Sequence, residues 1–204
     1  MTNIEQAELF KILIVGAPGC GKTSIIRRYT EGHFTPNYKS TIGVDFATKE
    51  LSLSKHKITL QLWDIAGQER CGAMTHIYYK SAAFAIIVFD SSRKQTLEEA
   101  AKWKNDVSGN AFLPNGKPIP MFLFANKSDL EPEVSQESIE EFSQQNGFVR
   151  WFFTSAKEDT NIDEAMRTLA QDLIELDIHP INREGVNLRD NSDQVKKKTN
   201  SGCC

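Results

Sequence analysis

GAPGCGKT, residues 16–23, is the stretch on which the fold class depends. It comes directly after the apolar run FKILIV (10–15) and directly before KTSIIRRYTEG (22–32), where apolar residues recur at helical spacing. The stretch matches the G-x-x-x-x-G-K-[ST] spacing of a phosphate-binding loop without a mismatch. Its glycines let main-chain N–H groups turn inward around a phosphate, and the following helix adds the positive end of its dipole. We therefore predict a strand, a phosphate loop and a helix in succession.

The loop assigns roles to particular side chains. Lys22 is expected to reach β- and γ-phosphate oxygens, and the Thr23 hydroxyl is expected to bind Mg²⁺. The alternative is a glycine-rich turn that binds nothing, which explains the glycines but not the lysine and threonine after them. Cys20 is most simply a small buried apolar residue. The nucleotide-binding residues predicted from this segment are Gly16, Ala17, Pro18, Gly19, Cys20, Gly21, Lys22, Thr23 and Ser24.

Composition narrows the class of protein. The chain has 204 residues, a length that suits one domain with a tail. Its net charge of −3 gives no overall positive field that would attract nucleic acid. No apolar run is long enough to cross a bilayer, and MTNIEQAELF (1–10) lacks the pattern of a secretory signal, which indicates a cytosolic protein. Four cysteines, two of them at the last two positions, do not form a disulfide framework.

Strand and helix patterns alternate along the chain. Residues 44–53 and 57–63 read as a hairpin, whereas the near-continuous apolar runs 84–90 and 120–127 fit strands buried on both faces of a parallel sheet. This order predicts a doubly wound α/β fold with right-handed crossovers. The remaining predicted elements are helices within 96–107, 135–146 and 161–176, and a strand at 151–154.

Polar residues follow the predicted strands where a ligand would lie. Asp64 ends the strand LQLWD (60–64), and in a phosphate-loop protein a carboxylate there holds Mg²⁺ directly or through water. On its own such an aspartate would only cap a turn. Because the phosphate loop from Gly16 to Thr23 is present, the metal interpretation is favoured.

Two tetrapeptides predict a guanine pocket. In NKSD (126–129), the Asp129 carboxylate can accept hydrogen bonds from guanine N1–H and its exocyclic amine, a pair that adenine does not offer. Asn126 and Lys127 would brace the pocket and cover the base. In TSAK (154–157), the Ala156 N–H would reach guanine O6, and Ser155 and Lys157 complete the predicted set. Each tetrapeptide alone could be a solvated loop, but both follow predicted parallel strands.

With these motifs the chain resembles a Ras-like small GTPase and, more narrowly, a Rab. The Rab-type segments are IGVDF (42–46), ITLQLWD (58–64), AGQER (66–70) and IYYKSA (77–82). WDIAGQER and the loop LPNGKPIP resemble the Rab subgroup tied to lysosome-related organelles. The resemblance implies a three-layer P-loop NTPase G domain over 8–178, with a six-stranded, mostly parallel sheet flanked by five helices, and a flexible tail at 179–204. It also implies switch regions near 34–46 and 65–80.

The resemblance carries roles over by position. Phe34 would stack on the guanine, and Thr41 would sense the γ-phosphate. Gly67 would give its N–H to the γ-phosphate, while Gln68 would orient the attacking water and share the catalytic role with Lys22. Tyr38 joins the nucleotide-binding residues, and the residues expected to hold Mg²⁺ are Thr23, Thr41 and Asp64.

Phe46, Trp63 and Tyr78 match the aromatic triad through which Rabs present their nucleotide state to effectors; plain core packing is the alternative. Two positions depart from the family pattern. Pro18 removes one N–H from the phosphate loop and crowds the γ-phosphate, and Cys71 replaces the usual phenylalanine after AGQER. Both departures leave hydrolysis rate and effector choice open.

The function implied is a GTP-hydrolysing switch in membrane traffic, monomeric in its G domain and free of nucleic acid. Effectors, a GTPase-activating protein, an exchange factor, a dissociation inhibitor and an escort protein are its implied partners. It would cycle between the cytosol and endosomal, lysosome-related or phagosomal membranes. Two alternative functions remain. One is a nucleotide-dependent binding module that has lost hydrolysis, which the presence of Pro18 suggests. The other is a P-loop ATPase or kinase, which Asp129 argues against because it favours guanine.

The chain ends in KKKTNSGCC (196–204), and the resemblance implies geranylgeranyl groups on Cys203 and Cys204. This is the usual Rab ending and differs from the C-a-a-X signal. Two incidental free thiols are the alternative. Residues from about Pro180 lack periodicity and read as a flexible tether.

Overall fold

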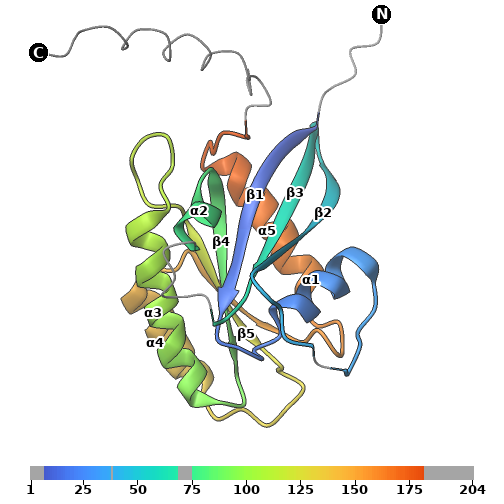
Figure 1. The fold of residues 1–204 in the computed structure, drawn as a ribbon, viewed down its shortest axis with the longest axis vertical. Coiled ribbons are helices and arrows are strands. Elements are labelled where there is room, and N and C mark those ends of the chain that lie inside the picture. Colours follow the sequence, from blue (N-terminus) through green and yellow to red (C-terminus); the bar gives the residue numbers. More distant parts are fainter. Residues whose placement is uncertain (1–6, 38, 69–74, 182–204) are drawn as a thin grey trace, which may run out of the picture.

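A six-stranded sheet in the order β2-β3-β1-β4-β5-β6 forms the centre of the molecule (Figure 1). The structure is a computed structural model that describes residues 7–37, 39–68 and 75–181. β2 and β3 pair antiparallel, and every other neighbouring pair is parallel. The strands are β1 (Glu8–Gly16), β2 (Val44–Leu53), β3 (His56–Ile65), β4 (Ala82–Asp90), β5 (Met121–Asn126) and β6 (Arg150–Thr154).

Helices cover both faces of this sheet. They are α1 (Lys22–Glu31), α2 (Thr75–Tyr79), α3 (Lys94–Asn110), α4 (Gln136–Asn146) and α5 (Ile162–Glu175). One core cluster joins the sheet to α1 and α5, and a second joins it to α2, α3 and α4. The prediction of a three-layer G domain with six strands and five helices is therefore confirmed. Within the described residues, no helix is long and apolar enough to span a membrane.

Local sequence explains where these elements begin and end. Every residue of β4 and β5 is buried, as the continuous apolar runs indicate. Helix α1 ends where Gly32 adopts a left-handed conformation and its amide donates to the Arg28 carbonyl. Ser135 caps the start of helix α4, because its side chain accepts a hydrogen bond from the Ser138 amide.

The register brings polar residues to one edge of the sheet. Asp90, Asn126 and Thr154 end three adjacent strands, and they are direct partners in the ladders of β4, β5 and β6. Gly16 ends β1 beside them and leads into the phosphate loop. The carboxyl edge of the parallel sheet is therefore where the predicted motifs meet.

Apart from shifts of one to three residues at element ends, three details differ from the sequence expectations. β3 continues past Asp64 to Ile65, because Ile65 pairs with Val44 of β2. Helix α2 has only five residues, too few for a periodic pattern. Ile178 is buried and the Ile181 amide donates to the Leu9 carbonyl at 2.8 Å, so residues 179–181, assigned to the tail, still lie against β1.

Candidate functional site

A cavity of about 430 Å³ opens at the carboxyl edge of the sheet, within the size range of small-molecule sites. Segments far apart in sequence form its wall: the phosphate loop, the chain after α1, the residues after β3, and the loops after β5 and β6. The predicted site residues in this wall are Pro18, Gly19, Gly21, Lys22, Thr23, Ser24, Phe34, Thr41, Gly67, Gln68, Asn126, Lys127, Asp129, Ala156 and Lys157. Sequence reasoning missed other wall residues, including Arg27, His33, Lys39 and Leu130.

Lys22 holds the phosphate loop in a curled conformation. Its ammonium donates to the carbonyl oxygens of Gly16 at 2.9 Å and Ala17 at 3.2 Å. Gly21 has a φ of 99°, and a Cβ there would lie 2.3 Å from the Asn126 amide nitrogen. A glycine is therefore required where the loop packs against the end of β5.

Gly67 brings the segment after β3 against the phosphate loop. A Cβ on Gly67 would lie 2.5 Å from the Pro18 nitrogen and 2.8 Å from the Gly16 oxygen, so no side chain fits. Gln68, the next residue, is exposed and belongs to the cavity wall. Both residues thus lie at the side of the cavity where a terminal phosphate would be.

Thr23, Thr41 and Asp64 form a compact oxygen cluster. The Thr23 hydroxyl donates to Asp64 Oδ2 at 2.5 Å, and the Thr41 hydroxyl lies 3.1 Å from the same oxygen and 2.9 Å from that of Thr23. Asp64 is 2% exposed, and its other oxygen has no hydrogen-bond partner within the described residues. Burial raises the pKa of Asp64, although Thr23, Lys22 and Thr41 act in the opposite direction.

This cluster fits a magnesium ion. Mg²⁺ prefers oxygen ligands, and a buried carboxylate oxygen without a partner is costly unless a cation or donor reaches it. In the described part of the chain, no three His, Cys, Asp or Glu side chains gather around one point. A cation here would therefore take one carboxylate, hydroxyl groups and phosphate oxygens, as in nucleotide sites.

Asp129 is positioned by the loop after β6. The Ser155 hydroxyl donates to its Oδ1 at 2.6 Å, and the Lys157 ammonium lies 3.7 Å from its Oδ2. The Asp129 side chain is only 10% exposed, although its main chain is open to solvent. Its carboxylate is therefore fixed at the cavity wall.

Asn126 links the two halves of the site. Its amide nitrogen donates to the Cys20 carbonyl at 2.8 Å, and its oxygen accepts from the Thr154 hydroxyl at 3.3 Å. Cys20 itself is fully buried, and burial raises the pKa of its thiol. The interpretation of Cys20 as a buried apolar residue agrees with this environment.

Arg28 is a supporting residue that the sequence did not reveal. Its guanidinium donates to the carbonyls of Ala156 at 2.9 Å, Lys157 at 3.1 Å and Gly32 at 2.9 Å. It thereby fixes the peptide groups of the loop after β6 and the end of α1, from which the chain continues to Phe34. Helical periodicity places Arg28 on a polar face of α1 and gives no sign of these contacts.

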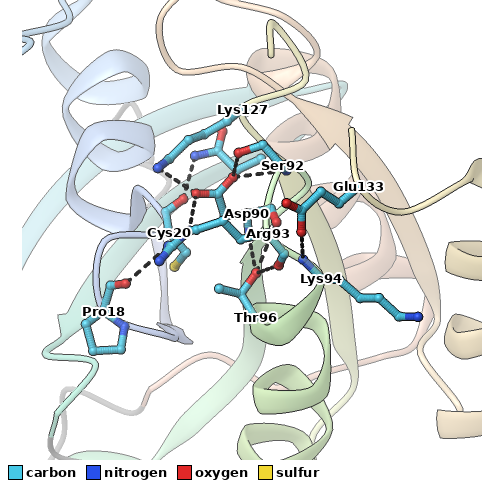
Figure 2. Close-up of polar contacts among 10 residues, drawn as sticks. Pro18, Cys20, Asp90, Ser92, Arg93, Lys94, Thr96, Lys127 and Glu133 are labelled. Carbon is cyan, nitrogen blue, oxygen red and sulfur yellow. Dashed lines mark hydrogen bonds and ion pairs between the residues drawn. The ribbon is translucent and has the colours of Figure 1, made fainter. Parts of the chain in front are cut away.

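Asp90, at the end of β4, organises a second polar cluster beside the cavity (Figure 2). Its carboxylate accepts hydrogen bonds from Lys127, Arg93 and Ser92. Burial alone would raise the pKa of Asp90, but the hydrogen bonds from Lys127, Ser92 and Arg93 outweigh it and lower the pKa. A signal for Asp90 was present, because it ends an apolar strand much as Asp64 does.

The aromatic triad joins β2, β3 and α2, and its members Trp63 and Tyr78 pack partly buried against the second core cluster. Phe46 and Trp63 are direct partners in the ladder, with ring centroids 6.0 Å apart, and Trp63 lies 6.3 Å from Tyr78. Phe46 is 60% exposed, which contradicts plain core packing for this residue. The Lys11 ammonium lies over the Trp63 ring, 3.5 Å from its centre, at the distance of a cation–π interaction.

Four predicted residues are outside the described part of the chain: Tyr38, Cys71, Cys203 and Cys204. Their assignments stay predictions.

Comparisons with known proteins agree with this geometry. The sequence model of the Ras family matches residues 11–175. Ras-related protein Rab-32B of Dictyostelium discoideum is 51% identical over 177 residues, which is 86% of this chain and 68% of that protein. Ras-related protein Rab-32 of Sus scrofa is 46% identical over 203 residues, 98% of this chain and 90% of the relative. The chain is a Rab of the Ras family.

A further relative of this Rab is the human Ras-related protein Rab-7L1, which is 44% identical over 201 residues and matched over 97% of its length. The family assignment confirms the prediction of a GTPase switch in membrane traffic. This Rab binds GTP and GDP and hydrolyses GTP. The rival interpretation as an ATPase or kinase is thereby excluded.

Proposed function

We propose that this Rab is a Mg²⁺-dependent switch whose nucleotide lies along the cavity described above. The phosphates would lie on residues 16–24, and the guanine between Phe34 and the loops after β5 and β6. The observation that carries this proposal is the placement of the fixed Asp129 carboxylate in the same cavity wall as Lys22 and Thr23. A base-edge acceptor and a phosphate cradle thus belong to one site.

Each residue then has a role in hydrolysis. Water attacks the γ-phosphorus, the bond to the bridging β–γ oxygen breaks, and GDP and phosphate result. Gln68 would orient the water, and the Gly67 N–H would face a γ-phosphate oxygen. Lys22 uses two ammonium protons on loop carbonyls, and its third would reach a phosphate oxygen. Thr23, Thr41 and Asp64 would hold Mg²⁺, which when bound neutralises charge that develops on the phosphates.

Replacing Gln68 by leucine is expected to leave GTP binding intact and to slow hydrolysis about tenfold or more, because leucine cannot hydrogen-bond the attacking water. Single-turnover phosphate release at saturating GTP measures the effect. Pro18→Gly, alone and combined with Gln68→Leu, serves as the control. Equal rates for Gln68→Leu and its parent in both backgrounds would remove Gln68 from the reaction. A large gain from Pro18→Gly alone would show that Pro18 limits the native rate.

Regulators are the second part of the proposal. We expect intrinsic turnover to be slow and to need a GTPase-activating protein, because enzymes of this class commonly gain the arginine that stabilises the transition state from such a partner. An exchange factor would release GDP, and effectors would read the Phe46–Trp63–Tyr78 triad. The exposed position of Phe46 supports a protein contact at this surface.

Membrane attachment is the third part. We infer that Cys203 and Cys204 carry geranylgeranyl groups, because one lipid chain gives reversible membrane binding whereas two hold firmly. Lys196, Lys197 and Lys198 would add attraction to an anionic leaflet, and residues after Ile181 would act as a tether. A dissociation inhibitor and an escort protein would shield the lipids in the cytosol. The subgroup-type segments WDIAGQER and LPNGKPIP support endosomal, lysosome-related or phagosomal membranes as the site of action.

Changing both terminal cysteines to serine is expected to make the full chain soluble in cells without affecting GTP hydrolysis. Fractionation of cells that express an N-terminally tagged chain measures the loss of membrane attachment, and mass spectrometry identifies the lipids on the parent. The single variants Cys203→Ser and Cys204→Ser should retain weaker attachment. A double variant that still sediments with membranes, or a parent with two bare thiols, would exclude this anchor.

A further inference from the structure

The cluster around Asp90 joins two parts of the nucleotide site from outside the cavity. On one side it holds Lys127, the lysine of the guanine motif. On the other it holds Arg93, whose guanidinium reaches the carbonyl oxygen of Pro18 in the phosphate loop (Figure 2). One buried carboxylate is therefore shared by residues that serve the base and the phosphates.

The contacts of Asp90 fix its carboxylate firmly. Oδ2 accepts from the Lys127 ammonium at 2.7 Å and from Arg93 Nε at 2.8 Å. Oδ1 accepts from the Ser92 hydroxyl at 2.7 Å and from the Ser92 amide at 3.1 Å. Asp90 is 1% exposed, so a charged carboxylate is tolerated only because these four donors surround it.

The turn that carries Arg93 is anchored on both sides. The Thr96 hydroxyl donates toward the Arg93 carbonyl at 2.7 Å and accepts from the Asp90 amide at 3.0 Å. The Ser91 amide donates to the Asn126 carbonyl, and the Ser91 carbonyl accepts from the Glu133 amide, both at 2.9 Å. Arg93 therefore starts from a rigid base at the end of β4 and the beginning of α3.

Arg93 spans the distance from this base to the phosphate loop. Its Nη2 lies 3.4 Å from the Pro18 carbonyl oxygen, and a Cβ on Gly19 would lie 3.8 Å from the same nitrogen. Pro18 has no N–H, so its carbonyl is the one main-chain group of this residue that can form a hydrogen bond. One guanidinium can bond the Asp90 carboxylate through Nε and the Pro18 carbonyl through Nη2 at the same time, because its N–H donors lie in a rigid planar group.

We propose that Asp90 and Arg93 are positioning residues that determine how long the nucleotide stays bound. Arg93 ties the phosphate loop at Pro18 to the carboxylate that also orients Lys127 over the guanine. Loosening this connection frees the loop and Lys127 together, so GDP and GTP both leave faster. The inference rests on the proposed placement of the nucleotide in the cavity.

The test measures release of a fluorescent GDP analogue from the full chain. Arg93→Ala is expected to raise the dissociation rate about three- to tenfold, since Arg93 is 48% exposed and its charge-assisted bonds are partly screened. Arg93→Lys should rescue little, because one ammonium cannot reach Asp90 and Pro18 together. Lys94→Ala is the matched control with an unchanged rate, because the Lys94 side chain points away from the cluster in Figure 2 and only its amide is bonded there.

A double-mutant cycle separates positioning from a merely structural ion pair. If Arg93 and Lys127 act through the shared Asp90, the combined Arg93→Ala and Lys127→Ala variant will release GDP at a rate that differs from the product of the single effects. Multiplicative effects, or an Arg93→Ala rate equal to the parent's, would overturn the proposal. The proposed placement of the nucleotide fails separately, if Asp129→Asn leaves GDP affinity unchanged, so the two failures are distinguishable.

Discussion

Replacing Asp129 by asparagine is expected to turn this Rab from guanine toward xanthine nucleotides. The Ser155 hydroxyl donates to Oδ1 of Asp129, and an asparagine that keeps this bond places its amide nitrogen where Oδ2 was. A donor then meets the N–H groups of guanine, whereas the C2 carbonyl of xanthine can accept from it. The loss of two charge-assisted hydrogen bonds, at about 1.5–3 kcal/mol each, predicts a fall in GDP affinity of about 100-fold or more.

Titration with GDP and with xanthosine diphosphate gives both affinities. Asp159→Asn is the matched control, because Asp159 lies near the same loop, 4.0 Å from Arg28 at its closest ion-pair contact, and is well exposed. That variant removes the same charge and is expected to bind GDP as the parent does. If Asp129→Asn leaves GDP affinity unchanged, Asp129 does not contact the base.

Much of this site follows from sequence because its motifs join a local spacing to the end of a strand. GAPGCGKT follows β1, Asn126 ends β5 and Thr154 ends β6, so parallel pairing alone brings them to one edge. The alternation of strands and helices in the sequence predicts this parallel pairing of the strands. The positions of Lys22 and Asp129 in one cavity wall are the consequence.

The supporting residues were not predictable in the same way. The bond from Arg28 to Ala156 joins residues 128 positions apart, and the bond from Arg93 to Pro18 joins residues 75 apart. Single arginines on a polar helix face or in a turn look like ordinary surface charges. Only the packed structure shows which carbonyl each guanidinium reaches.

The sequence also did not predict which aromatic side chains of β2 and β3 are exposed to solvent. The apolar alternation of β2 and β3 indicates one buried face, yet Phe46 is mostly exposed while its ladder partner Trp63 is partly buried. β2 is the edge strand of the sheet, and which helices cover which part of the sheet depends on tertiary packing. The exposure of Phe46 therefore could not be predicted from the strand pattern, and the assignment of the triad to effector binding stays a prediction.

Replacing Thr23 by asparagine is expected to shift the nucleotide preference toward GDP or the nucleotide-free state. The hydroxyl of Thr23 contacts Asp64 at 2.5 Å and Thr41 at 2.9 Å, so its loss takes one proposed Mg²⁺ ligand and loosens the other two. GTP binding should weaken more than GDP binding, because a bound Mg²⁺ would offset the larger phosphate charge of GTP. We expect GTP affinity to fall about 100-fold, which corresponds to about 2.7 kcal/mol, and GDP affinity to fall about tenfold or less.

Thr23→Ser separates the hydroxyl from the rest of the side chain, because serine keeps the oxygen and loses only the methyl group. It should retain both affinities to within a few-fold, and chelation of Mg²⁺ should accelerate nucleotide release from it as from the parent. Release from Thr23→Asn should be fast already and insensitive to the chelator. If Thr23→Asn keeps the parent's affinities and its response to chelation, the Thr23–Thr41–Asp64 cluster is a structural hydrogen-bond network and Mg²⁺ is held elsewhere.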